Sequence, residues 1–90
     1  MREEVQQFAE VMEKKLRDNE HKGGWDDESI DYLTFRMRQE TAQLFDALRI
    51  FHANPHEHSG RLVEEECADI ANFAMMINDL SKKIIAKGGK

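Results

Sequence analysis

Residues that break helices are rare in this chain, and their positions divide it into three long segments. The 90 residues include one proline, Pro55, and five glycines, which fall at Gly23-Gly24, Gly60 and Gly88-Gly89. Because glycine and proline are the strongest local breaks in regular structure, each segment between them can form one long helix. No segment alternates apolar and polar residues long enough to indicate a β-strand. The sequence therefore predicts an all-α fold.

Apolar residues recur at spacings of three and four within each segment, as they do on one face of a helix. Segments rich in glycine and acidic residues separate the predicted helices, and an Asn-Pro pair marks the second break. The predicted helices run from about Glu3 to Asn19, from Asp27 or Ser29 to Ile50 or Ala53, and from about Arg61 to Ala86, with loops at His21 to Asp27 and Asn54 to Gly60.

The small size of the chain predicts that it associates with copies of itself. Residues 1–90 make one domain, which can bury only a modest core. A single cysteine, Cys67, excludes an internal disulfide. The third predicted helix is apolar on most sides between Ala68 and Ile77, so it should be buried on most sides. We expect a protomer with a long antiparallel helix pair and an N-terminal helix, and four-helix-bundle cores formed in a homo-oligomer, either a dimer or a dimer of dimers.

Charge and hydropathy exclude two classes of partner. The formal net charge is -5, whereas a generic nucleic-acid binder would carry a basic stripe. No apolar stretch approaches the length of a membrane span. The residues from Met1 to Val5 lack the start of a signal peptide, so we expect a cytoplasmic protein.

Three acidic residues lie where the helical spacing predicts an apolar surface. Glu66 and Asp69 are three residues apart within the apolar stripe of the third helix, and Glu40 lies within the stripe of the second. Burying an ionised carboxylate is costly unless a positive partner meets it. A divalent cation that prefers oxygen ligands, Mg²⁺ or Mn²⁺, is the simplest such partner.

The second and third helices can bring these side chains together. Gln43 repeats the three-residue spacing after Glu40. In an antiparallel hairpin around Pro55, with a rise of about 1.5 Å per residue, Gln43 and Asp69 lie within about one turn of the same depth. Three carboxylates and an amide oxygen would then face one cavity, where Mg²⁺ relieves their repulsion and leaves positions for water and phosphates. The candidate metal ligands are Glu40, Gln43, Glu66 and Asp69.

The same residues carry a family resemblance. They are Gln39-Glu40-Thr41-Ala42-Gln43-Leu44 and Glu66-Cys67-Ala68-Asp69, supported by Trp25 and by Asp69-Ile70-Ala71-Asn72-Phe73. This pattern resembles the E-E-x-x-E…E-x-x-D signature of the MazG-type, all-α nucleoside triphosphate pyrophosphohydrolases, and in particular a small, often phage-encoded branch. The resemblance extends from Phe8 to about Leu80.

The resemblance implies an enzyme that hydrolyses (deoxy)nucleoside triphosphates, with purine deoxynucleotides as candidates, to monophosphate and pyrophosphate with Mg²⁺ or Mn²⁺. By position it implies catalytic roles for Glu40, Glu66 and Asp69. Glutamine stands at 39 and 43 where the pattern has glutamate. Gln43 offers a neutral oxygen without charge, which bears on metal preference and activity.

Three further residues are candidates for binding the substrate, each with a simpler alternative. Trp25 can stack on a base or can cap the end of the bundle. Lys22 can contact phosphates or can be an ordinary surface lysine. Asn72, amid apolar residues, can read the substrate or can bond to a neighbouring helix.

Two other functions remain open from the sequence. The substitutions at Gln39 and Gln43 are consistent with a non-catalytic helical oligomer or binding module that kept the fold and lost full metal binding. Alternatively, the acidic residues serve a structural oligomer through salt bridges with Arg36, Arg38 or Arg61.

Overall fold

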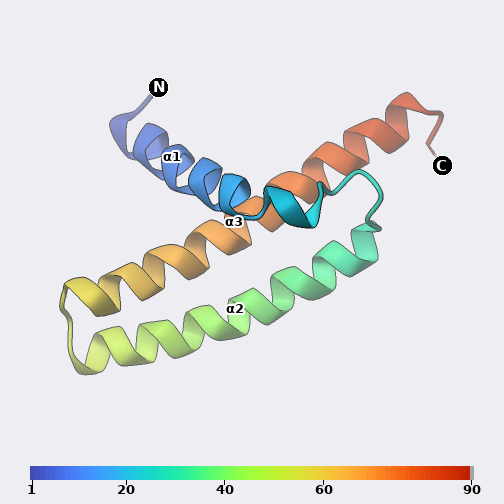
Figure 1. Ribbon diagram of the computed structural model, residues 1–90. Coiled ribbons are helices and arrows are strands. Elements are labelled where there is room, and N and C mark those ends of the chain that lie inside the picture. Colours follow the sequence, from blue (N-terminus) through green and yellow to red (C-terminus); the bar gives the residue numbers. More distant parts are fainter. Residues whose placement is uncertain (90) are drawn as a thin grey trace.

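Residues 1–89 fold into three α-helices and one short 3-10 turn. A computed structural model describes residues 1–89, and its fold is all-α, as the spacing of apolar residues predicts (Figure 1). Within that range there is no β-strand. The elements are α1 (Glu3–Asp18), η1 (Glu20–Lys22), α2 (Ile30–Ala53) and α3 (Glu57–Ala86).

The two longest helices form an antiparallel hairpin. α2 and α3 run side by side along most of their length and are joined by a tight turn (Figure 1). The first of them begins at a capped terminus, because the hydroxyl of Ser29 accepts a 3.0 Å hydrogen bond from the backbone amide of Tyr32. Among the described residues, no helix combines the length and apolar character needed to cross a bilayer.

The third helix begins four residues earlier than the sequence predicts. A start near Arg61 was expected because of Pro55 and Gly60, but α3 starts at Glu57. His56 and Ser59 form a reciprocal capping box, in which each side chain accepts from the other residue's backbone amide. Gly60 then lies inside the helix, where Phe51 of α2 comes within 3.8 Å of the position that a Cβ would take. A Cβ at this position would be in ordinary van der Waals contact with Phe51, and Gly60 belongs to the first turn of a helix rather than to a loop.

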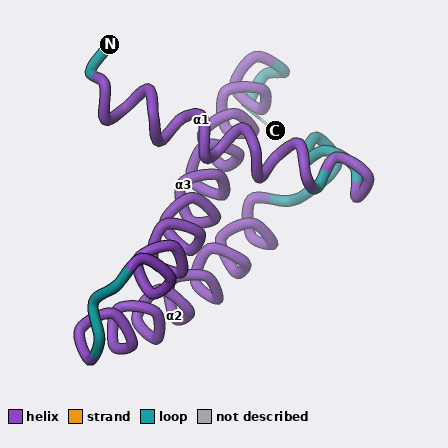
Figure 2. The backbone as a smooth tube through the Cα atoms, turned by 60° about the vertical axis from the view of Figure 1, so that its left-hand side comes forward, coloured by secondary structure: helices purple, strands orange, loops and turns teal. Residues whose placement is uncertain are grey.

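The first helix crosses the hairpin instead of lying along it. α1 packs on α3 near its middle (Figures 1 and 2). None of its residues is fully buried, and the apolar side chains that face α3 are partly buried. A polar bond between the two helices adds to these contacts, because Asn72 Nδ2 donates to the backbone oxygen of Met12 over 3.1 Å.

The folded chain has a small core and a large surface. Its solvent-accessible area is 6816 Å², whereas a compact monomer of this mass exposes about 5400 Å². Four large hydrophobic side chains of α2 are exposed to solvent, and only a few apolar residues of the described chain are buried. Those exposed are Tyr32, Phe35, Phe45 and Ile50, and those buried are Leu33, Ala47, Ala68 and Leu80.

Candidate metal centre

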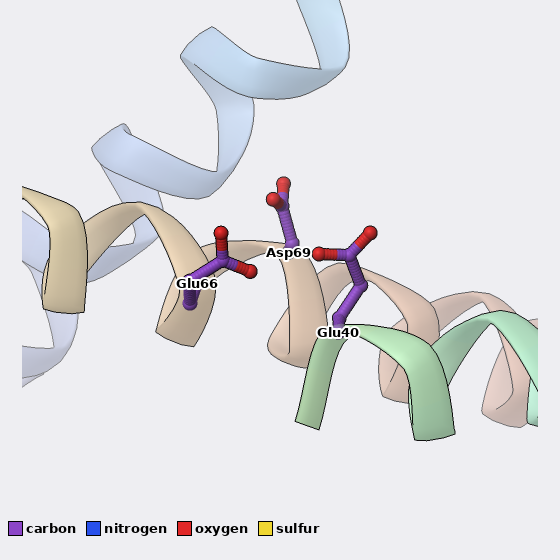
Figure 3. Close-up of side chains that lie close together, drawn as sticks. All are labelled: Glu40, Glu66 and Asp69. Atoms are coloured by element: carbon purple, nitrogen blue, oxygen red, sulfur yellow. The ribbon is translucent and has the colours of Figure 1, made fainter. Parts of the chain in front are cut away.

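Three carboxylates from the two hairpin helices meet at one point. Glu40 extends from α2, and Glu66 and Asp69 extend from neighbouring turns of α3 (Figure 3). One oxygen of each side chain lies within 4.8 Å of the other two. The side chain of Glu40 is only 8% exposed, and the other two are half-buried. The hairpin therefore brings together the acidic residues that the sequence places on the apolar stripes.

The side-chain amide of Gln43 lies against two of these carboxylates. With its nitrogen turned toward them, it donates to Glu40 Oε2 over 3.2 Å and to Glu66 Oε1 over 3.1 Å. The opposite orientation directs the amide oxygen at the same point. Gln43 thus can satisfy the carboxylates as a donor or join them as an oxygen ligand.

Crowding of negative charge changes the acidity of Glu66. Burial raises its pKa first, and the hydrogen bond and charge of Glu40 and the charge of Asp69 raise it further, to about 7. Lys15 acts in the opposite direction. A carboxyl group with this pKa holds a proton near neutral pH unless a cation replaces it.

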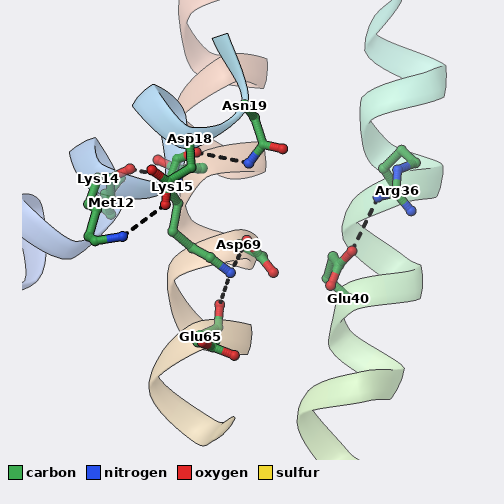
Figure 4. Close-up of polar contacts among 10 residues, drawn as sticks. Met12, Lys14, Lys15, Asp18, Asn19, Arg36, Glu40, Glu65 and Asp69 are labelled. Carbon is green, nitrogen blue, oxygen red and sulfur yellow. Dashed lines mark hydrogen bonds and ion pairs between the residues drawn. The ribbon is translucent and has the colours of Figure 1, made fainter. Parts of the chain in front are cut away.

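A lysine from α1 neutralises one member of the group. Lys15 Nζ lies 2.9 Å from Asp69 Oδ1 and donates to the backbone oxygen of Glu65 over 3.4 Å (Figure 4). The side chains of Lys15 and Asp69 are 26% and 28% exposed, so the pair is partly shielded from water. This contact links the first helix to the acidic cluster.

An arginine neutralises a second member from within α2. Arg36 Nη2 lies 3.3 Å from Glu40 Oε1, one helical turn away (Figure 4). The Arg36 guanidinium also lies over the ring of Phe73 on α3, 5.4 Å from its centroid. Three carboxylates therefore share two cations within the protein.

An open cleft of about 730 Å³ adjoins the carboxylates. Its walls come from α1, the loop after it, and the facing sides of α2 and α3. Glu40 and Asp69 line it, whereas Glu66 lies outside its lining. The cationic, aromatic and buried amide residues of the lining include Lys15, Lys22, Trp25, Arg36, Asn72 and Phe73, and three further carboxylates line it as well, those of Glu13, Glu20 and Glu28.

The three predicted substrate residues all line this cleft. Lys22 is exposed on η1. Trp25 is partly buried, and its indole nitrogen donates to Asp79 Oδ2 over 2.9 Å. This bond holds the ring against α3, which agrees with a role in closing the bundle and leaves it available as a wall of the cleft.

Asn72 is 5% exposed, and its two amide atoms have different environments. Its nitrogen bonds to α1, as predicted for a link to a neighbouring helix. Its oxygen Oδ1 is buried and has no hydrogen-bond partner within residues 1–89. Since an unpaired buried oxygen is costly, a hydrogen bond from a water or a ligand at this atom would stabilise it.

The carboxylate group fits a divalent ion in its chemistry. Opposite ligands of an octahedral Mg²⁺ lie about 4.2 Å apart, given Mg–O distances of about 2.1 Å. Neighbouring ligands of such an ion lie about 3.0 Å apart. The three oxygens lie within 4.8 Å of one another, so the side chains would have to draw closer together to bind one ion. Glu40, Glu66 and Asp69 would hold the ion, with the Gln43 oxygen as a further donor.

Sequence reasoning missed the partners of the acidic group. From the sequence, Arg36 was considered only for salt bridges in a structural oligomer. Arg36 could have been found from its four-residue spacing to Glu40. Lys15 and Asp79 carry no such signal, because their contacts depend on how α1 and the following loop cross α3.

Comparison with known proteins adds nothing to this geometry: no protein family, no curated protein and no solved structure matches the chain.

Proposed function

We propose that this protein is a Mg²⁺-dependent nucleoside triphosphate pyrophosphohydrolase of the MazG-like type. The observation that carries the proposal is the meeting of Glu40, Glu66 and Asp69 beside a cleft that also contains cations and an aromatic ring. Hard divalent ions, phosphate chains and planar bases are recognised by these three kinds of group, respectively.

The carboxylates supply the chemistry at one end of the cleft. Glu40, Glu66 and Asp69 hold the ion, and Gln43 contributes a neutral oxygen. When bound, Mg²⁺ neutralises phosphate charge and lowers the pKa of a bound water. The reaction is hydrolysis between the α and β phosphates, which gives a monophosphate and pyrophosphate. In such reactions most of the catalysis comes from positioning and charge neutralisation.

The other lining residues bind the rest of the nucleotide. Trp25 offers a ring face to the base, and the unpaired oxygen of Asn72 accepts a hydrogen bond from a base amino group or a sugar hydroxyl. Lys22 lies at the exposed side of the cleft, where it contacts phosphate. Deoxynucleotides with a purine base are the substrates we propose first.

A homo-oligomer completes the fold in this proposal. The protomer exposes roughly 1400 Å² more than a compact monomer of its mass, and a stable interface buries about 800 Å² per partner. The exposed aromatic residues of α2, Phe35 and Phe45, supply an apolar surface for a second copy. Sedimentation equilibrium should give a dimer or tetramer, and replacing both with aspartate should give monomers.

A substrate screen tests the enzymatic proposal. The common ribo- and deoxynucleoside triphosphates are incubated with Mg²⁺ or Mn²⁺, and pyrophosphate release is measured. Asp69→Asn should lose at least about 100-fold in rate, since one metal ligand is gone. Glu64→Gln is the matched control, because Glu64 is exposed on the same helix. Equal activity in the wild type and Asp69→Asn would contradict the proposal.

A non-catalytic binding module is the second candidate, and two ion pairs favour it. Lys15–Asp69 and Arg36–Glu40 already neutralise two of the three acidic side chains. A chain that had lost its metal would need such internal partners. Absence of both turnover and calorimetric metal binding in the wild type would select this candidate over the enzyme.

A further inference from the structure

Two cations that line the cleft pair with carboxylates of the acidic group. Lys15 Nζ contacts Asp69 Oδ1 at 2.9 Å, and Arg36 Nη2 contacts Glu40 Oε1 at 3.3 Å. All four side chains line the same cleft. A divalent ion and these two side chains therefore compete for the same negative charge.

Binding of a divalent ion would change the charge balance around the three carboxylates. Three carboxylates exceed two cations in the protein alone. A bound divalent ion reverses that balance, and the released side chains remain tethered beside it. A lysine side chain is long and flexible, so Lys15 can turn from Asp69 toward a phosphate in the cleft without movement of its backbone.

We propose that Lys15 is an exchangeable counter-ion: it pairs with Asp69 in the metal-free protein and, once a divalent ion takes Asp69, binds the phosphate chain of the ligand. Metal and phosphate then bind with positive coupling, because each favours the arrangement in which Lys15 has left Asp69. This inference rests on the proposed function and adds a phosphate-positioning residue from α1.

Lys15 is better suited to a test than Arg36. Arg36 also bonds to Gln39 and stacks on Phe73, so its loss would disturb the packing of the hairpin. Lys15 lies on a helix without buried residues. Its neighbour Lys14 is an exposed lysine paired with Asp18 and provides a matched control.

The experiment measures two affinities by calorimetry in the wild type, Lys15→Ala, Lys15→Arg and Lys14→Ala. The first titration uses Mg²⁺ alone, and the second uses pyrophosphate at saturating Mg²⁺. Lys15→Ala should bind Mg²⁺ about threefold more tightly, because a competing cation is gone. It should bind pyrophosphate about tenfold more weakly, because a charged donor is gone. Lys15→Arg should retain pyrophosphate binding, and Lys14→Ala should match the wild type.

The opposite signs of the two changes separate the possible outcomes. If Lys15→Ala weakens both affinities, the lysine only holds α1 in place, and the inference is overturned. Two unchanged affinities overturn it as well. If the wild type binds neither Mg²⁺ nor pyrophosphate, the proposed function itself fails. Circular dichroism of each variant confirms that helical content is equal.

Discussion

The indole nitrogen of Trp25 donates a 2.9 Å hydrogen bond to the carboxylate of Asp79, 54 positions later in the chain. Lys83 bridges the same carboxylate, at 2.7 Å, and Asp26, at 2.6 Å. The hydrogen bonds from Lys83 and Trp25 hold the pKa of Asp79 below its usual value. These contacts fasten the loop after α1 to the last turns of α3, and so they fix one wall of the cleft.

Replacing Asp79 should change the environment of Trp25. In Asp79→Ala the indole loses its acceptor and becomes more exposed, so its fluorescence should shift to longer wavelength. Trp25 is the only tryptophan in the sequence, so the emission reports this site alone. Under the proposed function, KM for a nucleotide should rise with little change in kcat. Asp46→Ala, an exposed change elsewhere on α2, should leave the emission unchanged; an unshifted maximum in Asp79→Ala would contradict the proposed role.

Replacing Glu66 with glutamine should weaken metal binding and stabilise the metal-free protein. The change removes one of three crowded charges while keeping the shape of the side chain. We expect at least a tenfold loss of Mn²⁺ affinity by calorimetry and a higher melting temperature in EDTA at pH 8. Glu64→Gln on the exposed side of α3 should alter neither quantity. A lower melting temperature of Glu66→Gln would indicate that this carboxylate stabilises the fold instead.

The pKa of Glu66 also predicts how the stability of the metal-free protein depends on pH. Folding raises this pKa from 4.5 to about 7, so the native state binds the proton more tightly than the unfolded state. The resulting contribution to the free energy of unfolding is fully present below pH 4.5 and is lost as the pH rises through 7. Urea unfolding of the wild type and Glu66→Gln across this range isolates the effect as a difference. If folding does not change the pKa of Glu66, the difference in unfolding free energy between the two proteins should not vary with pH.

Restoring a glutamate at position 43 should increase metal affinity at the expense of the metal-free fold. Gln43→Glu adds a fourth carboxylate and removes the two bonds that the amide can donate to Glu40 and Glu66. We expect about tenfold tighter Mn²⁺ binding and a loss of up to about 1 kcal/mol in unfolding free energy in EDTA, since the site is partly exposed. Gln39→Glu is the contrasting variant, because its side chain contacts Arg36 instead. Equal effects of both would exclude a specific role for Gln43.

The capping box at the start of α3 should be the most sensitive point of the hairpin turn. Ser59 is fully buried, and its hydroxyl also donates to the backbone oxygen of Asn54 or His56. Ser59→Ala should reduce the free energy of unfolding by about 1 to 2 kcal/mol in a urea titration. Ser81→Ala removes a hydroxyl from the same helix far from the capping box and should cost less.

Helical periodicity was sufficient to predict the three helices and the meeting of Glu40 with Glu66 and Asp69. Both follow from spacing along single helices and from one antiparallel turn. The start of α3 was predicted wrongly because Gly60 and the residues around Pro55 resemble a loop. The N-cap of α3 is a histidine, His56, which is not among the residues commonly found at this position, so the sequence does not indicate it.

The contacts of Lys15 and Trp25 could not be predicted from the sequence, for a different reason. Lys15 meets Asp69 across two helices that cross at an angle, and Trp25 meets Asp79 across a loop. Neither periodicity nor turn chemistry fixes such crossings, which depend on how side chains of α1 pack on α3. Asn72 was predicted as either a substrate contact or a link between helices, and its nitrogen makes the second of these.

The crossing of α1 over α3 has a consequence for how solution conditions act on the molecule. α1 has no buried side chain, and the contact between Lys15 and Asp69 supports its position. Dissolved ions at high concentration shield such a contact, whereas they leave the apolar seam of the hairpin intact. Added salt should therefore weaken this one ion pair more than it weakens the hairpin. The effect on α1 should be small, because the pair is partly shielded from water and α1 also packs on α3 through apolar side chains and the bond from Asn72 to Met12.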